Sequence, residues 1–511
     1  MDQLPQELIE LIVEFLSPDA SLPDEDEDGW SPYSDSRKPE SSLLPYATIS
    51  RAWQAAIERQ TFRSLKLNSD EYPMLKNTLG PHRYRCLQRL VLTIILPSYD
   101  SVSATKVETQ QDKDANDHAY SRAVHDIFDI LRSLEVVDGK SRSLEFYINH
   151  PVSRSDVQYF MGRGTKGSDG QIYEGRYFHS YIDLYNIHRL PKLRDVTKFV
   201  MKMPKTQLGH RMLYPRVPFQ IASKMPNLEA LSVDANDNER LYVDRRLKYR
   251  QDLAEHLQKL SLPKLRKADL HFLYTSPQDH YYMPPMINPT ADFDLLSSVC
   301  QSFSQGLEEL DLNGVLDVTL LRPLEGFKTA LWPRLEQLDI HFHQVRPAGG
   351  WYFTGDPPSW MPGPTPATEA IVDNPNEEFD FGQEMGLIGM QQTRYFRTTP
   401  DNDAITPLVE AFADAVAVMP KIRNAMLHST LGEGNVTPEW FVIAYVAPCR
   451  KPAACQGACY RLPERMLVTD LQGWVPADRV TNKLRNMGSK YYDVDITEES
   501  MDKFLSRNGR T

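Results

Sequence analysis

Long hydrophobic runs are missing from this sequence. The longest, at residues 440–447, has eight residues, whereas a helix that crosses a membrane needs about 20. The first ten residues, MDQLPQELIE, have neither the basic nor the apolar segment of a secretory signal peptide. We therefore expect no membrane segment, no signal peptide and no membrane partner.

Cysteine is also scarce, with five residues in a chain of 511. An odd and small number of cysteines excludes a disulfide framework and fits a reducing compartment, so we expect a cytoplasmic or nuclear protein, or both. Cys449, Cys455 and Cys459 are separated by six and four positions, and no histidine lies near them in the sequence. Structural zinc sites usually need two close pairs of ligands. Free thiols are therefore favoured over a metal site.

Positive charge is in deficit, because the net charge is −12. Residues 1–60 hold 13 acidic and 4 basic residues, a balance of −9 that leaves −3 for the other 451 residues. Proteins that bind nucleic acids usually carry a basic patch. The best basic cluster, DRRLKYR at 244–250, is interpreted as a solvated helix face. We expect no nucleic-acid partner.

Catalytic motifs are absent as well. Residues 162–167 satisfy the glycine pattern of a dinucleotide site, but turn-forming residues follow where that site needs a helix. We interpret them as a loop. No other spacing of acids, histidines or serines defines a catalytic set. The sequence therefore predicts no enzyme, no cofactor and no metal site.

The N-terminal part predicts two short helices. Residues 4–16 carry Leu8, Leu11, Ile12, Phe15 and Leu16 at helical spacing. Residues 17–42 are acidic and rich in serine and proline, which predicts a disordered insert. A second amphipathic helix follows over 43–59, and residues 62–67 alternate like a strand.

The centre of the chain contains an irregular repeat with the pattern L-x-x-L-x-L. Its copies lie at 86–94, 190–200, 225–235, 262–272, 306–314, 332–342 and 419–429. Apolar positions one, four and six of each copy suit the buried side of a short strand. Each copy can bury this side only against its neighbours, which is typical of a solenoid. The fold class predicted is α/β, with parallel strands in an irregular leucine-rich-repeat-like solenoid.

The spacing of the copies is longer than the 20–29 residues of ordinary leucine-rich repeats. The intervening segments must therefore contain helices or loops, and some copies can be too degenerate to recognise. The Pro- and Gly-rich segment at 344–376 is predicted to be an exposed loop. Residues 440–447 are predicted to form a buried strand within a C-terminal cap and tail at 431–511.

Three patterns in residues 3–67 together resemble an F-box, particularly those of the large filamentous-fungal F-box families. They are Leu4-Pro5-x-Glu7-Leu8-Ile9-x-x-Ile12-x-x-x-Leu16, Ala47-Thr48-Ile49-Ser50-Arg51-x-Trp53 and Phe62-x-x-Leu65-x-Leu67. The insert between the first two is longer and more acidic than usual. Residues 68–430 resemble the irregular leucine-rich-repeat region that often follows an F-box.

This resemblance implies an adaptor that docks on Skp1, and through it on a cullin–RING ligase, while the repeat region holds a protein substrate for ubiquitin transfer by the partners. The residues implied in the Skp1 contact are Leu4, Pro5, Leu8, Ile9, Ile12, Leu16, Ile49 and Trp53. Two alternatives stay open: the helices simply cap the repeat region, or the chain is a repeat-protein scaffold with no ubiquitin-ligase role.

A column of aspartates is predicted on the repeat strands. Asp269, Asp311 and Asp339 occupy the same outward position in three successive copies, and His271 and His341 lie two positions later. Carboxylates directly opposite one another destabilise a sheet. One interpretation is a solvated face that happens to contain three aspartates. The other is a surface that binds the basic segment of a substrate. A metal site is less favoured, because His271 and His341 would be two strands apart.

Overall fold

The computed structural model describes residues 4–16, 43–135, 142–160, 172, 176–177, 180–203, 211–239, 241–288, 290, 293–322, 331–364, 385–390, 392–431, 439–448 and 464–507. The acidic insert at 17–42, the glycine pattern at 162–167 and the three cysteines at 449–459 lie outside these residues. The chain divides into two compact units. Unit 1 comprises residues 1–213, 220–232 and 262–264, and unit 2 comprises 214–219, 233–261 and 265–511. Both are mixed α/β, with mostly parallel strands.

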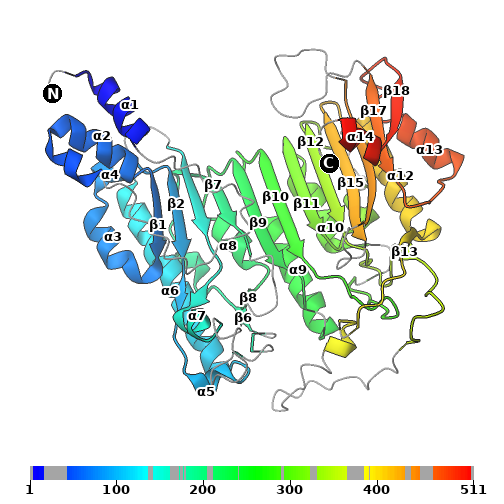
Figure 1. The fold of residues 1–511 in the computed structure, drawn as a ribbon, viewed down its shortest axis with the longest axis horizontal. Coiled ribbons are helices and arrows are strands. Elements are labelled where there is room, and N and C mark those ends of the chain that lie inside the picture. Colours follow the sequence, from blue (N-terminus) through cyan, green and yellow to red (C-terminus); the bar gives the residue numbers. More distant parts are fainter. Residues whose placement is uncertain are drawn as a thin grey trace. The chain divides into compact units, whose positions relative to one another are not determined.

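Unit 1 is built around four parallel strands in the order β1-β2-β4-β7 (Figure 1). Its sheet and its longer helices are α1 (Gln6–Leu16), α2 (Arg51–Thr61), β1 (Ser64–Asn68), α3 (Tyr72–Thr78), β2 (Arg89–Thr93), α6 (Gln110–Leu134), β4 (Leu144–Ile148), α7 (Arg154–Phe160) and β7 (Val196–Met201). Shorter elements are α4 (Pro81–Tyr84), β3 (Ile95–Leu96), α5 (Ser101–Ala104), β5 (Val152–Ser153), β6 (Tyr181–Ile182) and β8 (Met212–Leu213). Two elements, α8 (Val217–Ala222) and β9 (Ala230–Asn236), contain the boundary between the units.

The helix α6 explains the long interval between two neighbouring strands of unit 1. Parallel neighbours need a crossover connection, and α6 supplies it between β2 and β4. Thr109 accepts a hydrogen bond from the N–H of Asp112, whose carboxylate accepts one from the N–H of Thr109, so the helix begins with a capping box. Phe128 of α6 meets Phe146 of β4 with their ring centroids 6.3 Å apart.

Among the described residues of unit 2, seven strands of the large sheet follow one another in the order β10-β11-β12-β15-β16-β17-β18. They are β10 (Lys267–Leu273), β11 (Glu309–Gly314), β12 (Gln337–Phe342), β15 (Asn424–Leu431), β16 (Glu439–Val446), β17 (Arg465–Asp470) and β18 (Ile496–Ser500). The first four are parallel, β16 is antiparallel to both of its neighbours, and β17 and β18 are parallel. The other elements are α9 (Val243–Lys259), α10 (Leu295–Ser304), β13 (Phe353–Thr354), β14 (Thr399–Pro400), α12 (Asn402–Val418), α13 (Asp478–Arg485) and α14 (Met501–Arg507).

The repeat copies become strands, as predicted. The seven copies contain β2, β7, β9, β10, β11, β12 and β15 in chain order. The strand predicted at 62–67 is β1, and the one predicted at 440–447 is β16. One strand of unit 1, β4, has no recognisable copy of the pattern although it pairs with both β2 and β7. The C-terminal tail is also structured, since β17, α13, β18 and α14 lie within it.

The prediction of an exposed loop at 344–376 is wrong for its first part. Trp351, Tyr352 and Phe353 are buried. Phe353 belongs to β13, which pairs with β14, and its ring lies 5.9 Å from that of Phe441. Burial of three consecutive aromatic side chains stabilises this part of the segment, although glycines and prolines flank it. The chain is therefore packed here and not exposed.

The interpretation of residues 244–250 as a solvated helix face is wrong for Arg246 and Arg250, which are buried in α9. Arg246 donates to Asp237 at 2.9 Å, and Arg250 binds both Asp237 and Asp294. Burial alone would raise the pKa of Asp237, but the two guanidinium groups hold it below its usual value. This buried network joins α9 to Asp294, the residue that caps α10.

His280 of unit 2 is a buried neutral imidazole that binds the backbone of residues 396–397. Its Nδ1 accepts hydrogen bonds from the N–H groups of Phe396 and Arg397, at 2.9 and 2.7 Å. The ring of Trp351 lies 4.9 Å away. Burial, helped by the nearby charge of Arg397, lowers the pKa of His280 to about 4.

We expect acid to destabilise unit 2 through His280. Between the unperturbed pKa near 6.5 and the folded value, the unfolded state binds a proton that the folded state excludes. The free energy of unfolding should therefore fall by about 3 kcal/mol as the pH drops from 6.5 to 4. Urea unfolding measured across this range should show a weaker pH dependence in His280→Gln and an unchanged one in His188→Gln, a control at an exposed site. An equal pH dependence in all three proteins would contradict the assignment.

Candidate functional site

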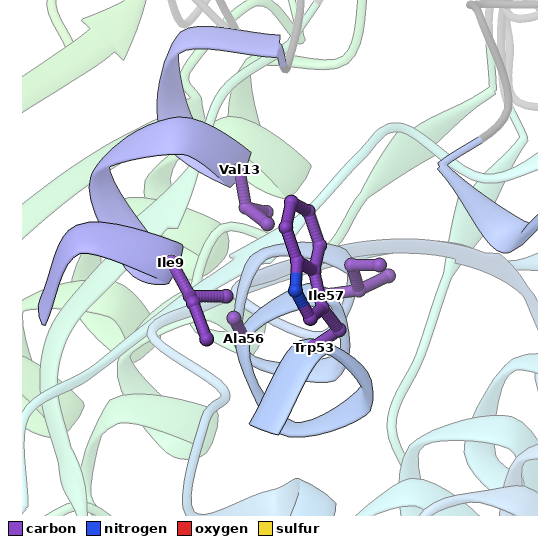
Figure 2. Packing of buried hydrophobic residues seen from close by; sticks show 5 residues of the cluster. All are labelled: Ile9, Val13, Trp53, Ala56 and Ile57. Carbon is purple, nitrogen blue, oxygen red and sulfur yellow. The ribbon is translucent and has the colours of Figure 1, made fainter. Parts of the chain in front are cut away.

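The first candidate surface is the helix pair α1 and α2 in unit 1. Ser50 caps α2, because its side chain accepts a hydrogen bond from the N–H of Trp53. Ile9 and Val13 of α1 point toward Trp53, Ala56 and Ile57 of α2, as Figure 2 shows. These five buried side chains form the core that joins the two helices.

The structure separates the predicted Skp1-contact residues into two groups. Ile9 and Trp53 are buried inside the α1–α2 core of this chain, and their assignment to the Skp1 contact stays a prediction. The remaining six, which are exposed, are Leu4, Pro5, Leu8, Ile12, Leu16 and Ile49. The helix therefore packs on α2 through a different side from the one that carries most of its leucines.

Two further exposed apolar residues on α1 were missed as contact candidates. Phe15 is 90% exposed and Leu11 is 59% exposed. Both are part of the same helical stripe as Leu8. Their spacing was the signal that could have added them to the list. We call Leu4, Leu8, Leu11, Ile12, Phe15 and Leu16 the α1 apolar face.

The second candidate surface is the face of unit 2 that carries the predicted aspartate column. Asp269 of β10 pairs in register with Asp311 of β11, which pairs with Asp339 of β12. Leu270, Leu312 and Ile340, one position later, are almost fully buried on the opposite face. The prediction that these three carboxylates share one face and lie on neighbouring strands is confirmed.

The next outward row on these strands consists of histidines and an asparagine. His271 pairs in register with Asn313, Asn313 with His341, and His341 with His428 of β15. His271 and His341 thus lie on β10 and β12 with β11 between them, as expected. We call the two rows together the Asp/His face.

Each aspartate of the column lies beside an imidazole. The Nε2 atom of His271 lies 2.9 Å from Oδ1 of Asp269 and 3.6 Å from Oδ1 of Asp311. Its Nδ1 atom lies 3.5 Å from Oδ1 of the buried Asp234 on β9. His428 lies 2.9 Å from Asp339 through its Nε2 atom. The carboxylates are therefore not simply solvated.

His341 occupies the centre of a stack of rings. Its centroid lies 4.6 Å from that of His428, with the planes at 15°, and 5.7 Å from that of His343. Asn313 contacts its Nδ1 at 3.1 Å, and Thr430 contacts its Nε2 at 3.2 Å. Burial, together with the neighbouring histidines, lowers the pKa of His341 to about 2.

His341 therefore stays neutral, and both of its ring nitrogens have partners in the fold. This arrangement suits a positioning role for His341 better than a direct charged contact with a ligand. Trp440 of β16, which no sequence pattern indicated, extends the stack, with its ring 5.8 Å from that of His428.

The histidine and aspartates at the β10 end of the face come close enough to share one ion. One ligand atom each from Asp269, His271 and Asp311 lies within 4.8 Å of the other two. From the sequence, we weighed a metal site only between His271 and His341. The sequence did not indicate that Asp269 and His271, two positions apart on one strand, lie close to Asp311 of the neighbouring strand, because that geometry depends on the register.

Alanine substitutions at buried and at exposed positions of α1 should affect the hydrogen exchange of this helix differently. Ile9→Ala removes packing against Trp53, and large-to-small changes in a core cost about 2–5 kcal/mol. We expect Ile9→Ala to speed hydrogen exchange in residues 6–16 by weakening the docking of α1. Leu11→Ala, at an exposed position of the same helix, should leave the exchange unchanged. Equal effects of the two substitutions would contradict this packing.

Among the described residues, no helix is both long enough and apolar enough to cross a membrane. A comparison of the chain with models of known protein families, with curated proteins and with solved structures found no match.

Proposed function

We propose that the chain is a substrate-recognition adaptor of an SCF-type ubiquitin ligase, which binds Skp1 through α1 and α2 and a protein substrate through its leucine-rich-repeat-like region. The proposal combines the F-box resemblance of residues 3–67 with one observation, the α1 apolar face. The chain itself supplies no catalytic step in this function, because partner proteins carry out ubiquitin transfer.

The α1 apolar face supports the proposal because it is too large and too continuous for a helix whose packing is complete. One side of α1 already docks on α2 through Ile9 and Val13. Burying an exposed aliphatic or aromatic side chain in an interface stabilises it by roughly 1.5–3 kcal/mol. An amphipathic helix that lays such a face in a partner's groove is a recurring mode of protein recognition.

The substrate region is proposed to include the Asp/His face. Its three aspartates are aligned in register, and like charges on neighbouring strands repel one another by a few tenths to about 1 kcal/mol each. A substrate segment rich in lysine or arginine would relieve this repulsion, and its binding would weaken as the salt concentration rises.

Charged substitutions on the α1 apolar face should abolish Skp1 binding. We expect Leu8→Asp with Phe15→Asp to remove Skp1 from the purified complex, because two buried aspartates would lose their hydration without a partner. The measurement is co-purification of the full chain with Skp1. The matched control is Met74→Asp at an exposed apolar position of α3, which should leave the complex intact.

Circular dichroism of the double variant should match that of the wild type, since both residues are exposed in the isolated chain. Retained Skp1 would contradict the adaptor proposal. A wild-type chain that captures a substrate but never Skp1 would instead support a repeat-protein scaffold without a ligase role.

Replacing Asp269, Asp311 and Asp339 together by asparagine should reduce the capture of proteins with basic segments. The control is the triple variant of the exposed acids Asp244, Asp403 and Asp478 to asparagine, which changes the net charge equally. We expect the stability of the first variant to change by no more than about 1 kcal/mol, because repulsion between the carboxylates disappears with them. Capture measured by quantitative mass spectrometry that is identical for both triple variants would contradict this substrate surface.

A further inference from the structure

We propose that Asp269, His271 and Asp311 form a binding site for a divalent transition metal ion of the zinc type. The site lies entirely within unit 2, and it does not depend on the adaptor function proposed above. It joins two adjacent residues of one strand face to one residue of the neighbouring strand.

The spacing of the three side chains suits a small ion. In a tetrahedral zinc site with bonds of about 2.0–2.1 Å, neighbouring ligand atoms lie about 3.3 Å apart. The Nε2 atom of His271 lies 2.9 Å from Asp269 and 3.6 Å from Asp311, so the two distances fall on either side of this value. The ligand atoms of all three residues lie within 4.8 Å of one another. Small side-chain rotations would bring them to ligand positions.

Asp234 lies where metal sites usually have a residue that orients the metal-binding histidine. Histidines that bind metals usually direct their other ring nitrogen to a carboxylate, a carbonyl group or water, which orients the ring. The Nδ1 atom of His271 lies 3.5 Å from Oδ1 of Asp234, while its Nε2 atom faces the two other aspartates. Asp234 is buried, so its carboxylate is a fixed part of the face.

The charge and the exposure of the site also favour a cation. Asp269 and Asp311 are paired in register, and a divalent ion would replace their repulsion by attraction to a common centre. The side chain of Asp311 is 49% exposed, so an ion can enter from solvent and keep a water molecule as its fourth ligand. One imidazole with two carboxylates suits zinc or cobalt, whereas calcium and magnesium prefer oxygen ligands throughout.

The neighbouring pair on the same face provides a natural comparison. Asp339 lies 2.9 Å from His428, as Asp269 does from His271. The register partners of Asp339 are Asp311 on β11 and Met426 on β15. Among the described residues, however, the group of three ligand atoms that lie close together is the one formed by Asp269, His271 and Asp311. We therefore expect Asp339 and His428 to bind no metal ion by themselves.

The test is a titration of the full-length chain, freed of metal with a chelator, by ZnCl₂ in a calorimeter. We expect saturable binding that includes a component lost in His271→Ala and in Asp311→Asn. Asp234→Asn should weaken this component by about 10- to 100-fold, the usual effect of losing a residue that orients a ligand. Asp339→Asn and His428→Ala should leave it unchanged. MgCl₂ should not compete.

A parallel titration with CoCl₂ separates this site from the cysteines of the chain. Cobalt bound by nitrogen and oxygen ligands absorbs in the visible range without the intense thiolate charge-transfer band that cysteine ligands produce. We expect the His271→Ala variant to lose the nitrogen–oxygen spectrum and to retain any thiolate band. Circular dichroism of each variant checks its fold, above all for Asp234→Asn, which changes a buried side chain.

Three outcomes would overturn the proposal: no saturable binding, equal binding in all variants, or a cobalt spectrum with thiolate features alone. In the first case His271 serves as the charge partner of the aspartates. Because zinc and a lysine-rich segment would need the same carboxylates, zinc should also lower the capture of basic segments if both proposals hold. Loss of Skp1 binding in the α1 variants is independent of all these results, so either proposal can fail alone.

Discussion

The parallel register of β10, β11, β12 and β15 determines the chemistry of unit 2. Because side chains alternate between the two faces of a strand, a pattern repeated in each strand becomes two uniform surfaces. Mainly leucine, isoleucine and phenylalanine line the buried surface, and mainly polar residues, including the aspartates and histidines of the Asp/His face, line the other. A shift of one residue in any strand would move its apolar side chains to solvent. Burial of the apolar face thus keeps Asp269 and Asp311 adjacent, although their own charges oppose it.

This constraint explains which parts of the fold could be predicted from the sequence. The alternation in the pattern L-x-x-L-x-L indicates both that a copy forms a strand and which of its residues are buried. It therefore predicted the positions of the strands in the seven copies. It did not locate β4, whose sequence LEFYI contains the alternation but not the leucines that precede it in the other copies. The lengths between strands were informative too, since parallel neighbours require crossovers and α6, α10 and α12 supply them.

The errors share a different cause, which is that burial depends on partners distant in the sequence. The sequence alone indicates a solvated helix at Arg246 and Arg250, but in the fold these residues are paired with Asp237 and Asp294. The prolines and glycines around Trp351 and Phe353 indicate an exposed loop, but in the fold Phe353 pairs with β14 and contacts Phe441. In α1, the same helical spacing that indicated an apolar stripe could not tell which apolar residues would face α2. Ile9 and Val13 do so, and the more numerous leucines do not.

The histidines of unit 2 show how one residue type acquires different properties from its surroundings. His280 accepts two backbone hydrogen bonds and is surrounded by aromatic rings, and burial keeps it neutral. His341 is kept neutral by burial and by the histidines stacked around it. His271 differs from both, because three carboxylates from three strands surround its two ring nitrogens. Carboxylates gathered in this way attract a cation to the space between them. A divalent ion would neutralise two carboxylates, and two carboxylates face Nε2.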